Sequence, residues 1–375
     1  MIDQNTLFDQ LNVMGLNFFT GVPDSLLNDF CLHLVNNVPD CQHIMAANEG
    51  NAIGIAAGYH MATGKIPVVY MQNSGIGNAT NPLLSLTHRC VYGIPLILLI
   101  GWRGDPAIKD HAQHKKQGEL TPVLMEDMDI PYQVLDADDT VIEKFQWAAN
   151  KAKELNAPVA LIAKKAILTQ KEKKQEYAES PLMNREEAIS AVLDVFGKDA
   201  IYLATTGRAT RELHEQIMIH GFSHEIEFLN VGAMGHLSSI GLGLAVGAPN
   251  KKIVVFDGDA AAVMHMGSLA TNGRYQPKNL IHIVLNNGVN ESVGGQKSSG
   301  QVINLTAIAK GCGYETIPAF VESKEDLQKA VKQLAESNHL SFLDVHVRQG
   351  IRKDMPGLKI EHQHAKSALM NYLNK

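Results

Sequence analysis

The sequence predicts an α/β protein with two open, mostly parallel sheets that are covered by helices. Short apolar runs of strand length alternate with helix-length segments along the 375 residues, which is typical of strand–helix–strand units. Most runs are apolar at every position, as expected when helices cover both faces of a parallel sheet. A charged segment separates two halves of similar length, so we expect two sheets of about six strands each.

The expected strands are found in both halves. In the first half they are residues 16–20, 43–46, 66–71, 96–101, 132–135 and 159–163. In the second half they are residues 201–204, 227–231, 253–256, 281–285, 315–317 and 342–347. Residues 169–187 hold few apolar side chains and the charged run 171–174. This composition predicts a solvated linker, or alternatively an exposed charged helix, between domains 1–168 and 188–375.

Composition and charge exclude several classes of protein. Hydrophobic residues make up 45% of the chain and charged residues 19%, which is typical of a globular protein. The net charge of −6 argues against nucleic acid or an anionic membrane as the main partner. The N-terminus has no basic start followed by an apolar run, and the apolar run 94–100 is far shorter than the roughly 20 residues that cross a bilayer. We therefore expect a cytoplasmic protein whose four irregularly spaced cysteines are buried free thiols.

Two strand ends of the second half carry oxygen ligands. The strand 253–256 runs into Gly258, Asp259, Ala260 and Ala261, where small residues let backbone N–H groups approach an anion at a helix N-terminus. The next strand ends at Asn286-Asn287, and Asn287 follows Asp259 by 28 residues. Because Mg²⁺ prefers oxygen ligands and is often shared with substrate phosphates, the combination predicts a diphosphate and magnesium site. Taken singly, a helix cap and a hairpin turn are the structural alternatives.

These two motifs resemble the Gly-Asp-Gly…Asn-Asn signature of thiamine-diphosphate (ThDP) enzymes, although Ala260 replaces the last glycine of the first motif. The resemblance implies that Asp259, the Asn287 side chain and the Val289 carbonyl hold Mg²⁺ against the cofactor. Met234, after the strand 227–231, would support the bent cofactor. The remaining cofactor contacts implied in this half are Thr206, Gly232, Gly258, Ala260 and Ala261.

An acid in the first half completes the resemblance. Glu49 lies where the strand 43–46 leads into a helix, and by itself it could be an acid that the helix dipole favours. The resemblance implies instead that Glu49 activates the cofactor's pyrimidine ring, beside the turn Asn73, Ser74 and Gly75. Residues 1–168 would then be the pyrimidine-binding domain and residues 188–375 the diphosphate-binding domain. Enzymes of this family join the two domains across a subunit interface, which implies a homodimer or a higher homo-oligomer.

The segments 20–27, 71–75, 100–106 and 286–296 resemble the phosphonopyruvate decarboxylases and their relatives, the sulfopyruvate decarboxylases. The resemblance implies decarboxylation of phosphonopyruvate to phosphonoacetaldehyde in phosphonate biosynthesis. Sulfopyruvate as substrate, carboligation of a small 2-keto acid, and a non-catalytic cofactor-binding subunit are the alternatives.

An anionic 2-keto acid requires cations around its tail. The candidates are Arg103, Lys109, Lys297 and Arg352, each of which could equally be a solvated surface cation. Asp24 and Ser25 lie at a strand end, where they could contact the substrate or relay a proton. His111 and His114 have a spacing that could suggest zinc, but no further ligands accompany them, so we expect no metal there.

Overall fold

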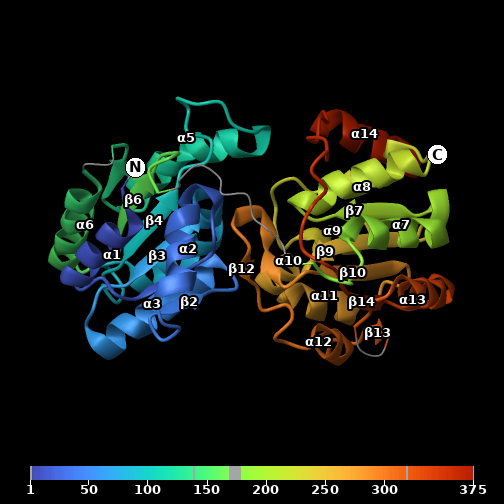
Figure 1. Ribbon diagram of the computed structural model, residues 1–375, viewed down its shortest axis with the longest axis horizontal. Helices are drawn as coiled ribbons and strands as arrows, with labels where there is room; N and C mark the ends of the chain where they lie inside the picture. The colour runs from blue at the N-terminus through green and yellow to red at the C-terminus, as the bar shows by residue number, and fades with distance from the viewer. Residues whose placement is uncertain (1, 138–139, 169–178, 318–319, 375) are drawn as a thin grey trace. The chain divides into compact units, whose positions relative to one another are not determined.

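A computed structural model describes residues 2–137, 140–168, 179–317 and 320–374 (Figure 1). The chain divides into two compact units, Met1–Gln175 with Val293–Gln296 and Glu176–Ser292 with Lys297–Lys375. Each unit contains one six-stranded sheet in which all the strand pairs are parallel. The expected fold class is confirmed.

The first unit has the strand order β2-β1-β3-β4-β6-β5. Its strands are β1 (Phe19–Gly21), β2 (His43–Met45), β3 (Val68–Gln72), β4 (Ile97–Gly101), β5 (Tyr132–Leu135) and β6 (Val159–Ala163). One face packs against α1 (Gln4–Val13), α2 (Asn28–Asn37) and α6 (Val141–Leu155). The other face packs against α3 (Glu49–Thr63), α4 (Ile76–Pro82) and α5 (Ala112–Asp127). Short helical turns η1 (Ser25–Leu27), η2 (Asn73–Gly75) and η3 (Leu83–Thr87) follow strand or helix ends.

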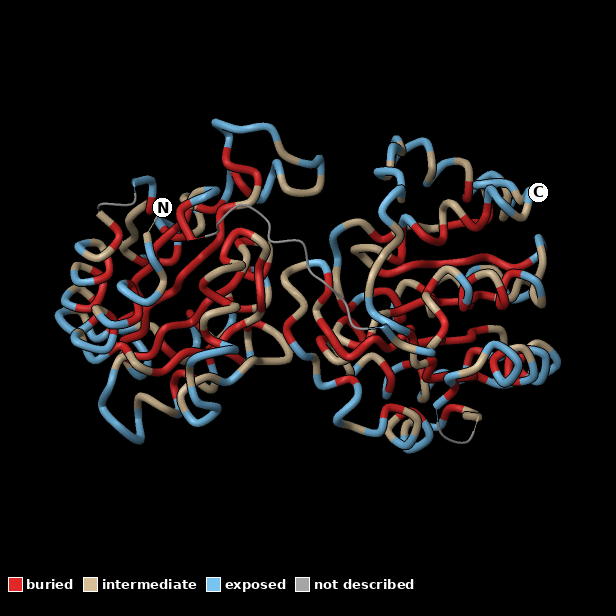
Figure 2. The backbone as a smooth tube through the Cα atoms, in the orientation of Figure 1, coloured by how far each residue is buried: buried red, intermediate tan, exposed pale blue. Residues whose placement is uncertain are grey.

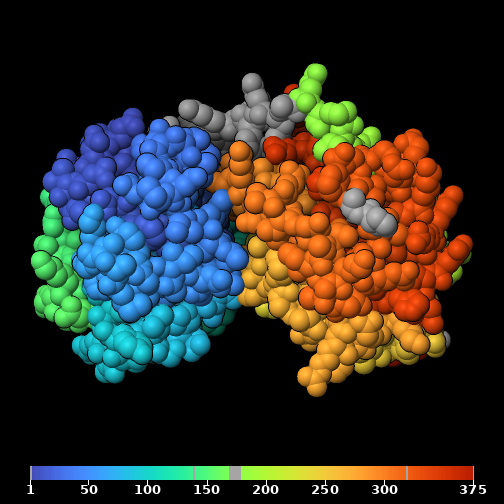
Figure 3. All heavy atoms as spheres, turned by 90° about the horizontal axis from the view of Figure 1, so that it is seen from below, coloured from blue at the N-terminus to red at the C-terminus, as the bar shows by residue number. Residues whose placement is uncertain are grey.

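Alternation along β3 shows how both faces of the first sheet become buried. Val68 and Tyr70 belong to the core beneath α1, α2 and α6, whereas Val69 and Met71 belong to the core beneath α3, α4 and α5. This follows from the two-residue period of a strand. Figure 2 shows buried strands inside more exposed helices, and Figure 3 shows that the first third of the chain forms most of this unit's surface in that view.

The second unit has the strand order β13-β14-β10-β9-β7-β8. Its strands are β7 (Ile201–Ala204), β8 (Glu227–Leu229), β9 (Ile253–Gly258), β10 (Leu280–Asn286), β13 (Glu315–Thr316) and β14 (Ser341–His346). Read from the β8 edge, this order is the same as in the first unit: second, first, third, fourth, sixth and fifth strand. The two halves therefore share one topology as well as one composition pattern.

The helices of the second unit cover the sheet and its edge. They are α7 (Arg185–Phe196), α8 (Arg208–Ile219), α9 (Leu237–Gly247), α10 (Asp259–Met264), α11 (Gly267–Tyr275), α12 (Leu305–Gly311), α13 (Lys324–Glu336) and α14 (His362–Leu373). The short elements are η5 (Gly197–Asp199), η6 (His224–Ile226), η7 (Glu291–Val293), β11 (Val289–Asn290) and β12 (Gln296–Lys297). Helix α14 packs against η6 and β8.

Local details differ from the sequence-based expectations. The first strand begins at Phe19 rather than at residue 16, because the turn after α1 continues through Gly15, whose φ is +78°. Residues 169–178 of the expected linker lie outside the described residues. Residues 185–187, also expected in the linker, instead form the first turn of α7, because Asn184 and Glu187 make a reciprocal capping box.

The four cysteines are free, as expected, but the expectation that all are buried is wrong. Cys31 is buried in α2, Cys312 is partly buried, and Cys41 and Cys90 are exposed. The exposed pair lies in loops, where little apolar surface is available to cover a thiol. No helix in the described part of the chain combines the length and the apolar character that crossing a membrane requires.

Candidate active site

The candidate residues lie at the carboxyl ends of the two sheets. In each sheet the first strand has the second on one side and the third on the other, so the strand order switches sides between the first and third strands. Ligands of open parallel sheets bind at such points, beyond the strand ends. In the first unit Asp24 and Gln72 lie there, and in the second unit Thr205 and Asp259 lie there.

Asp259 is a buried carboxylate at the start of α10, with only 2% of its surface exposed. Burial raises its pKa to about 6, although hydrogen bonds from the Ser298 hydroxyl and from the backbone N–H groups of Asn287 and Ala260 act in the opposite direction. A Cβ added at Gly300 would lie 2.3 Å from the Asp259 Cβ, so only glycine fits there. An ionised carboxylate in this position is unfavourable without a cation, which suits Asp259 to hold one.

Asn287 is oriented by a buried ion network. Its amide Nδ2 donates to Glu291 Oε2 at 3.3 Å, and Arg185 Nη1 donates to the same Glu291 oxygen at 2.7 Å. Arg185 also pairs with Glu212 at 2.7 Å, and Arg208 lies 3.1 Å from Glu291 Oε1. The network therefore fixes the Asn287 side chain through residues on α7, α8 and η7.

Sequence reasoning assigned no role to Arg185, Glu212 or Glu291. Arg185 lies 27 residues before Glu212 and 106 before Glu291, and no local motif joins them. No signal in the sequence around these three residues singles them out.

Glu49 is held at the start of α3, and 5% of its surface is exposed. Asn78 Nδ2 donates to its Oε2 at 2.7 Å. A Cβ added at Gly75 would lie 2.3 Å from the Glu49 Oε1, so glycine is required for this approach. Burial raises the Glu49 pKa, and the Asn78 hydrogen bond only partly opposes that effect. The carboxyl group is therefore suited to hold and release a proton.

A second hydrogen-bonded group in the first unit contains Asp24. Gln72 Nε2 donates to Asp24 Oδ1 at 2.7 Å, and the Ser74 hydroxyl donates to Gln72 Oε1 at 2.8 Å. Asp24 is fully buried, and burial raises its pKa. A Cβ added at Gly101 would lie 1.9 Å from Asp24 Oδ2, so this glycine allows the close approach of β4.

Arg103 lies beside this group. Its Nη1 donates to the Ser25 hydroxyl at 3.3 Å, and its Nε and Nη2 bind Asp110 at 2.8 and 2.7 Å. The structure therefore brings Arg103 to Ser25 and its neighbour Asp24, while Gln72 orients Asp24 and Asp110 orients Arg103. Asn73, in contrast, uses its side-chain amide to bind the Arg103 backbone and Thr121.

Comparisons with known proteins identify the family of this chain. Residues 4–125 match the N-terminal thiamine pyrophosphate binding domain of thiamine pyrophosphate enzymes, and residues 205–345 match the C-terminal one. Phosphonopyruvate decarboxylases of Streptomyces viridochromogenes and Streptomyces hygroscopicus are each 30% identical over 93% of this chain, which covers 89% and 88% of those proteins. The chain belongs to the thiamine pyrophosphate-dependent decarboxylases.

Two further proteins similar to this ThDP enzyme are also decarboxylases by name. A sulfopyruvate decarboxylase of Methanosarcina acetivorans is 28% identical over 90% of this chain and 89% of its own length. The crystal structure of benzoylformate decarboxylase from Polynucleobacter necessarius covers 93% of this chain and 99% of its own, with 12% identity and a TM-score of 0.40.

The residues of the second unit fit the family's cofactor. The Thr205 hydroxyl is buried at the end of β7 and has no hydrogen-bond partner among the described residues. It therefore offers a polar contact to a ligand beside Gly258 and Asp259. The turn after β8 is held by Asn230, whose side chain binds both the carbonyl and the N–H group of Ala233.

The other expected cofactor residues of this ThDP enzyme lie around those strand ends. Met234 is half-buried in the turn that Asn230 holds, and Gly232 is exposed in the same turn. Ala260 is half-buried and Ala261 is buried in α10, Thr206 is half-buried after β7, and Val289 is buried in β11.

The four candidate cations of this enzyme differ in their surroundings. Lys109 and Lys297 are exposed. Arg352 binds Glu186, Glu215 and Asp354 of the second unit. Arg103 is the one of the four whose guanidinium contacts another candidate site residue, Ser25.

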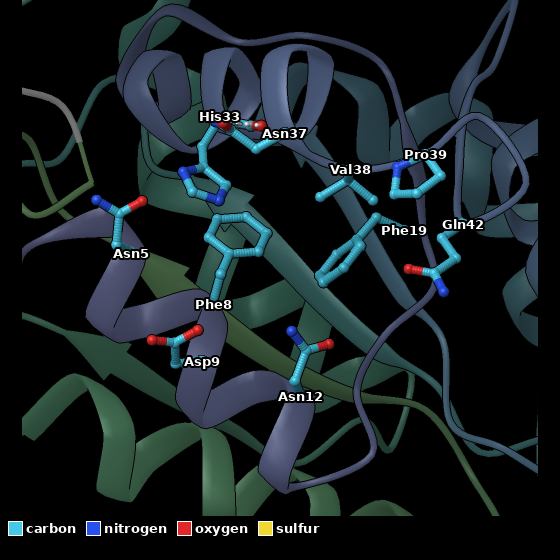
Figure 4. A pocket seen from close by; sticks show the side chains of 10 residues that line it. All are labelled: Asn5, Phe8, Asp9, Asn12, Phe19, His33, Asn37, Val38, Pro39 and Gln42. Atoms are coloured by element: carbon cyan, nitrogen blue, oxygen red, sulfur yellow. Dashed lines mark hydrogen bonds between the residues drawn. The ribbon is translucent and has the colours of Figure 1, made fainter.

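A separate cavity of about 320 Å³ lies in the first unit (Figure 4). It is lined by Asn5, Phe8, Asp9, Asn12, Phe19, His33, Asn37, Val38, Pro39 and Gln42. Phe19 begins β1 and Gln42 immediately precedes β2, so the cavity lies at the amino ends of these strands. It is therefore at the opposite end of β1 from Asp24 and is separate from the candidate active site.

Proposed function

We propose that this chain catalyses the ThDP- and Mg²⁺-dependent decarboxylation of phosphonopyruvate, which takes up one proton and gives phosphonoacetaldehyde and CO₂. The observation that carries the proposal is the 30% identity to phosphonopyruvate decarboxylases along 93% of the chain. The buried Asp259, Glu49 and Asp24 carboxyl groups at strand ends support it. The reaction would belong to phosphonate biosynthesis.

In this proposal residues 188–375 form the diphosphate-binding domain. Asp259, the Asn287 side chain and the Val289 carbonyl would hold Mg²⁺, and Met234 would support the cofactor. Thr206, Gly232, Gly258, Ala260 and Ala261 would line the same site. Bound ThDP would supply the electron sink that accepts the electrons released with CO₂.

Residues 1–168 form the pyrimidine-binding domain in this proposal. Glu49 would donate a hydrogen bond from its carboxyl group to the pyrimidine ring, which requires that it hold a proton near neutral pH. The raised pKa of Glu49 supports that role. Gly75 would matter because it lets the Glu49 carboxyl group lie against the turn that begins with Asn73 and Ser74.

Asp24 and Arg103 would act on the substrate. The raised pKa of Asp24 suits it to deliver the proton that replaces CO₂ on the substrate carbon, with Gln72 and Ser74 fixing its orientation. Arg103 would bind the phosphonate tail together with Ser25, using the N–H groups of Nη1 and Nη2 that point away from Asp110, since a guanidinium binds a tetrahedral anion through two neighbouring N–H groups. Lys109, Lys297 and Arg352 are weaker candidates for this contact.

We also propose that the chain works as a homodimer or a higher homo-oligomer in the cytoplasm.

Sulfopyruvate is the second candidate substrate, favoured by the 28% identity to a sulfopyruvate decarboxylase over 90% of the chain. Its tail is a sulfonate, which carries one negative charge where a phosphonate carries up to two.

The test is CO₂ release from phosphonopyruvate, sulfopyruvate and pyruvate, each with and without ThDP and Mg²⁺. Cofactor-dependent release with the highest kcat/KM for phosphonopyruvate is expected. Preference for sulfopyruvate would keep the mechanism and change the substrate, whereas a product longer than the substrate would indicate a carboligase. Cofactor binding without any release would indicate a non-catalytic subunit.

Arg103→Lys sharpens the test of the anion site. A lysine loses the two-pronged contact, so KM for phosphonopyruvate should rise about 10-fold while KM for pyruvate stays unchanged. Arg89→Lys is the matched control, because Arg89 is half-exposed and its contact with Asp129 is 3.5 Å long. An equal rise in KM for both substrates would contradict the role of Arg103.

A further inference from the structure

We propose that the second unit contains a binding site for a divalent transition-metal ion, best suited to Zn²⁺, formed by His214, His224 and Glu227. The site is independent of the proposed ThDP chemistry. Among the residues that the structure describes, this is the single group of three histidine, cysteine or acidic side chains close enough to share one ion.

Three elements bring the ligands together. His214 lies on α8, His224 begins η6, and Glu227 is the first residue of β8. The Nδ1 atoms of His214 and His224 lie 2.6 and 2.9 Å from the same oxygen, Glu227 Oε1. The two imidazole rings stack with their centroids 4.1 Å apart, and all the ligand atoms lie within 4.8 Å of one another.

The donor set determines the class of ion. Two imidazole nitrogens and one carboxylate oxygen are typical of zinc sites that keep an open position for water. Tetrahedral zinc, with ligands about 2.0–2.1 Å away, separates its ligand atoms by about 3.3 Å. The hydrogen-bonded atoms of this group therefore need to move apart by less than an ångström. His224 is 45% exposed, which gives an ion access and lets its side chain adjust.

The burial of the Glu227 carboxylate favours a bound cation at this site. Glu227 is only 6% exposed, and its Oε2 has no hydrogen-bond partner among the described residues. A buried carboxylate with an unpaired oxygen costs free energy unless a cation compensates for it. A single divalent ion bound by this carboxylate and the two imidazoles would supply the compensating charge.

The site lies away from the candidate active site. Glu227 pairs with Tyr202 at the amino end of β8, whereas Asn230 and Met234 follow the carboxyl end of that strand. Strand β8 is an edge strand of three residues, and α14 packs over it and over η6. A metal ion here would join α8, η6 and β8 and stabilise this edge of the sheet.

Zinc titration of the holoenzyme tests the site. The protein is saturated with ThDP and Mg²⁺, so that the cofactor site is occupied, and Zn²⁺ binding is followed by calorimetry and by metal content after gel filtration. We expect one Zn²⁺ per chain and a visible absorption band when Co²⁺ replaces it. At free Zn²⁺ about 100 times Kd, the thermal unfolding midpoint should rise by roughly 5 °C.

Three substitutions separate this site from general histidine binding. His224→Gln and His214→Gln should each weaken Zn²⁺ binding at least about 10-fold, whereas the control His339→Gln, at a 72% exposed side chain, should leave it unchanged. Because His224 is half-exposed, its variant should fold, as circular dichroism would show. Equal Zn²⁺ affinity in His224→Gln and the parent chain would overturn the proposal, as would the absence of Zn²⁺ binding. Neither result would bear on decarboxylation.

Discussion

The two sheets have the same strand order, but their strand ends carry different chemistry. After the second strand, the first unit has Glu49 and the second unit has the turn with Met234. After the third strand, the first unit has Asn73, whose amide binds the backbone, and the second unit has Asp259. The shared topology determines where a ligand can bind, and the residues after each strand determine what the site can do.

Glu49 and Asp259 make this difference concrete. Both are buried acids in the first turn of a helix, and burial raises the pKa of each. Asn78 is the side chain that donates to Glu49, whereas Asp259 is surrounded by the Ser298 hydroxyl and several backbone N–H groups. The first environment suits an acid that holds a proton, and the second suits an anion that holds a cation.

The largest expected effect tests the proton-holding side of the comparison. Glu49→Gln should lower kcat roughly 10²–10⁴-fold with ThDP and Mg²⁺ saturating, because the amide cannot transfer a proton. Steady-state CO₂ release measures it. Glu143→Gln is the matched control, since Glu143 is an exposed acid in the first turn of α6. An unchanged kcat in Glu49→Gln would remove Glu49 from the mechanism.

The next effect tests the cation-holding side. Asp259→Asn should weaken Mg²⁺-dependent ThDP binding by about 100-fold, because the amide removes the one charged ligand of the proposed Mg²⁺ site. Fluorescence titration of ThDP at several Mg²⁺ concentrations measures the change, and Asp127→Asn, at an exposed residue of α5, serves as control. If Asp259→Asn bound ThDP with the parent's Mg²⁺ dependence, the metal site would lie elsewhere.

Asp259 should also make the metal-free protein less stable at high pH. The pKa of Asp259 is about 6 in the folded protein, whereas the ordinary value for an aspartate in water is 3.8. Well below pH 3.8 the residue is protonated in both states, and above pH 6 folding requires a buried charge. In the presence of a metal chelator, Asp259→Asn should therefore raise the free energy of unfolding by about 3 kcal/mol at pH 8.

Denaturant unfolding at pH 8 and at pH 4 measures this effect. The gain should largely disappear at the lower pH, and excess Mg²⁺ should reduce it at the higher pH. A gain of the same size at both values of pH would show that charge burial is not its cause.

The smallest effect concerns the support of Asn287. Glu291→Gln should weaken Mg²⁺ binding about 10-fold, since residues that orient a metal ligand typically contribute 10–100-fold in affinity. Glu336→Gln, at an exposed residue of α13, should have no effect. If Glu291→Gln lowered only thermal stability and left Mg²⁺ affinity unchanged, the ion network would be purely structural.

Local sequence was sufficient to predict the sheets. Apolar runs such as 159–163 and 201–204 coincide with β6 and β7, because a strand buried on both faces needs an apolar side chain at nearly every position. The positions of Glu49 and Asp259 at strand ends followed from the same runs. Short motifs and their spacing were therefore enough to indicate the ends of both sheets.

Packing between distant segments decided the rest. The approach of Gly75 and Asn78 to Glu49, the Arg185 network beneath Asn287, and the group of His214, His224 and Glu227 all join residues from different elements. A linear sequence shows which side chains are present, but their distances depend on how helices pack on a sheet. Burial then changes the pKa of the acids, since the same carboxyl group behaves differently in water and in a protein interior.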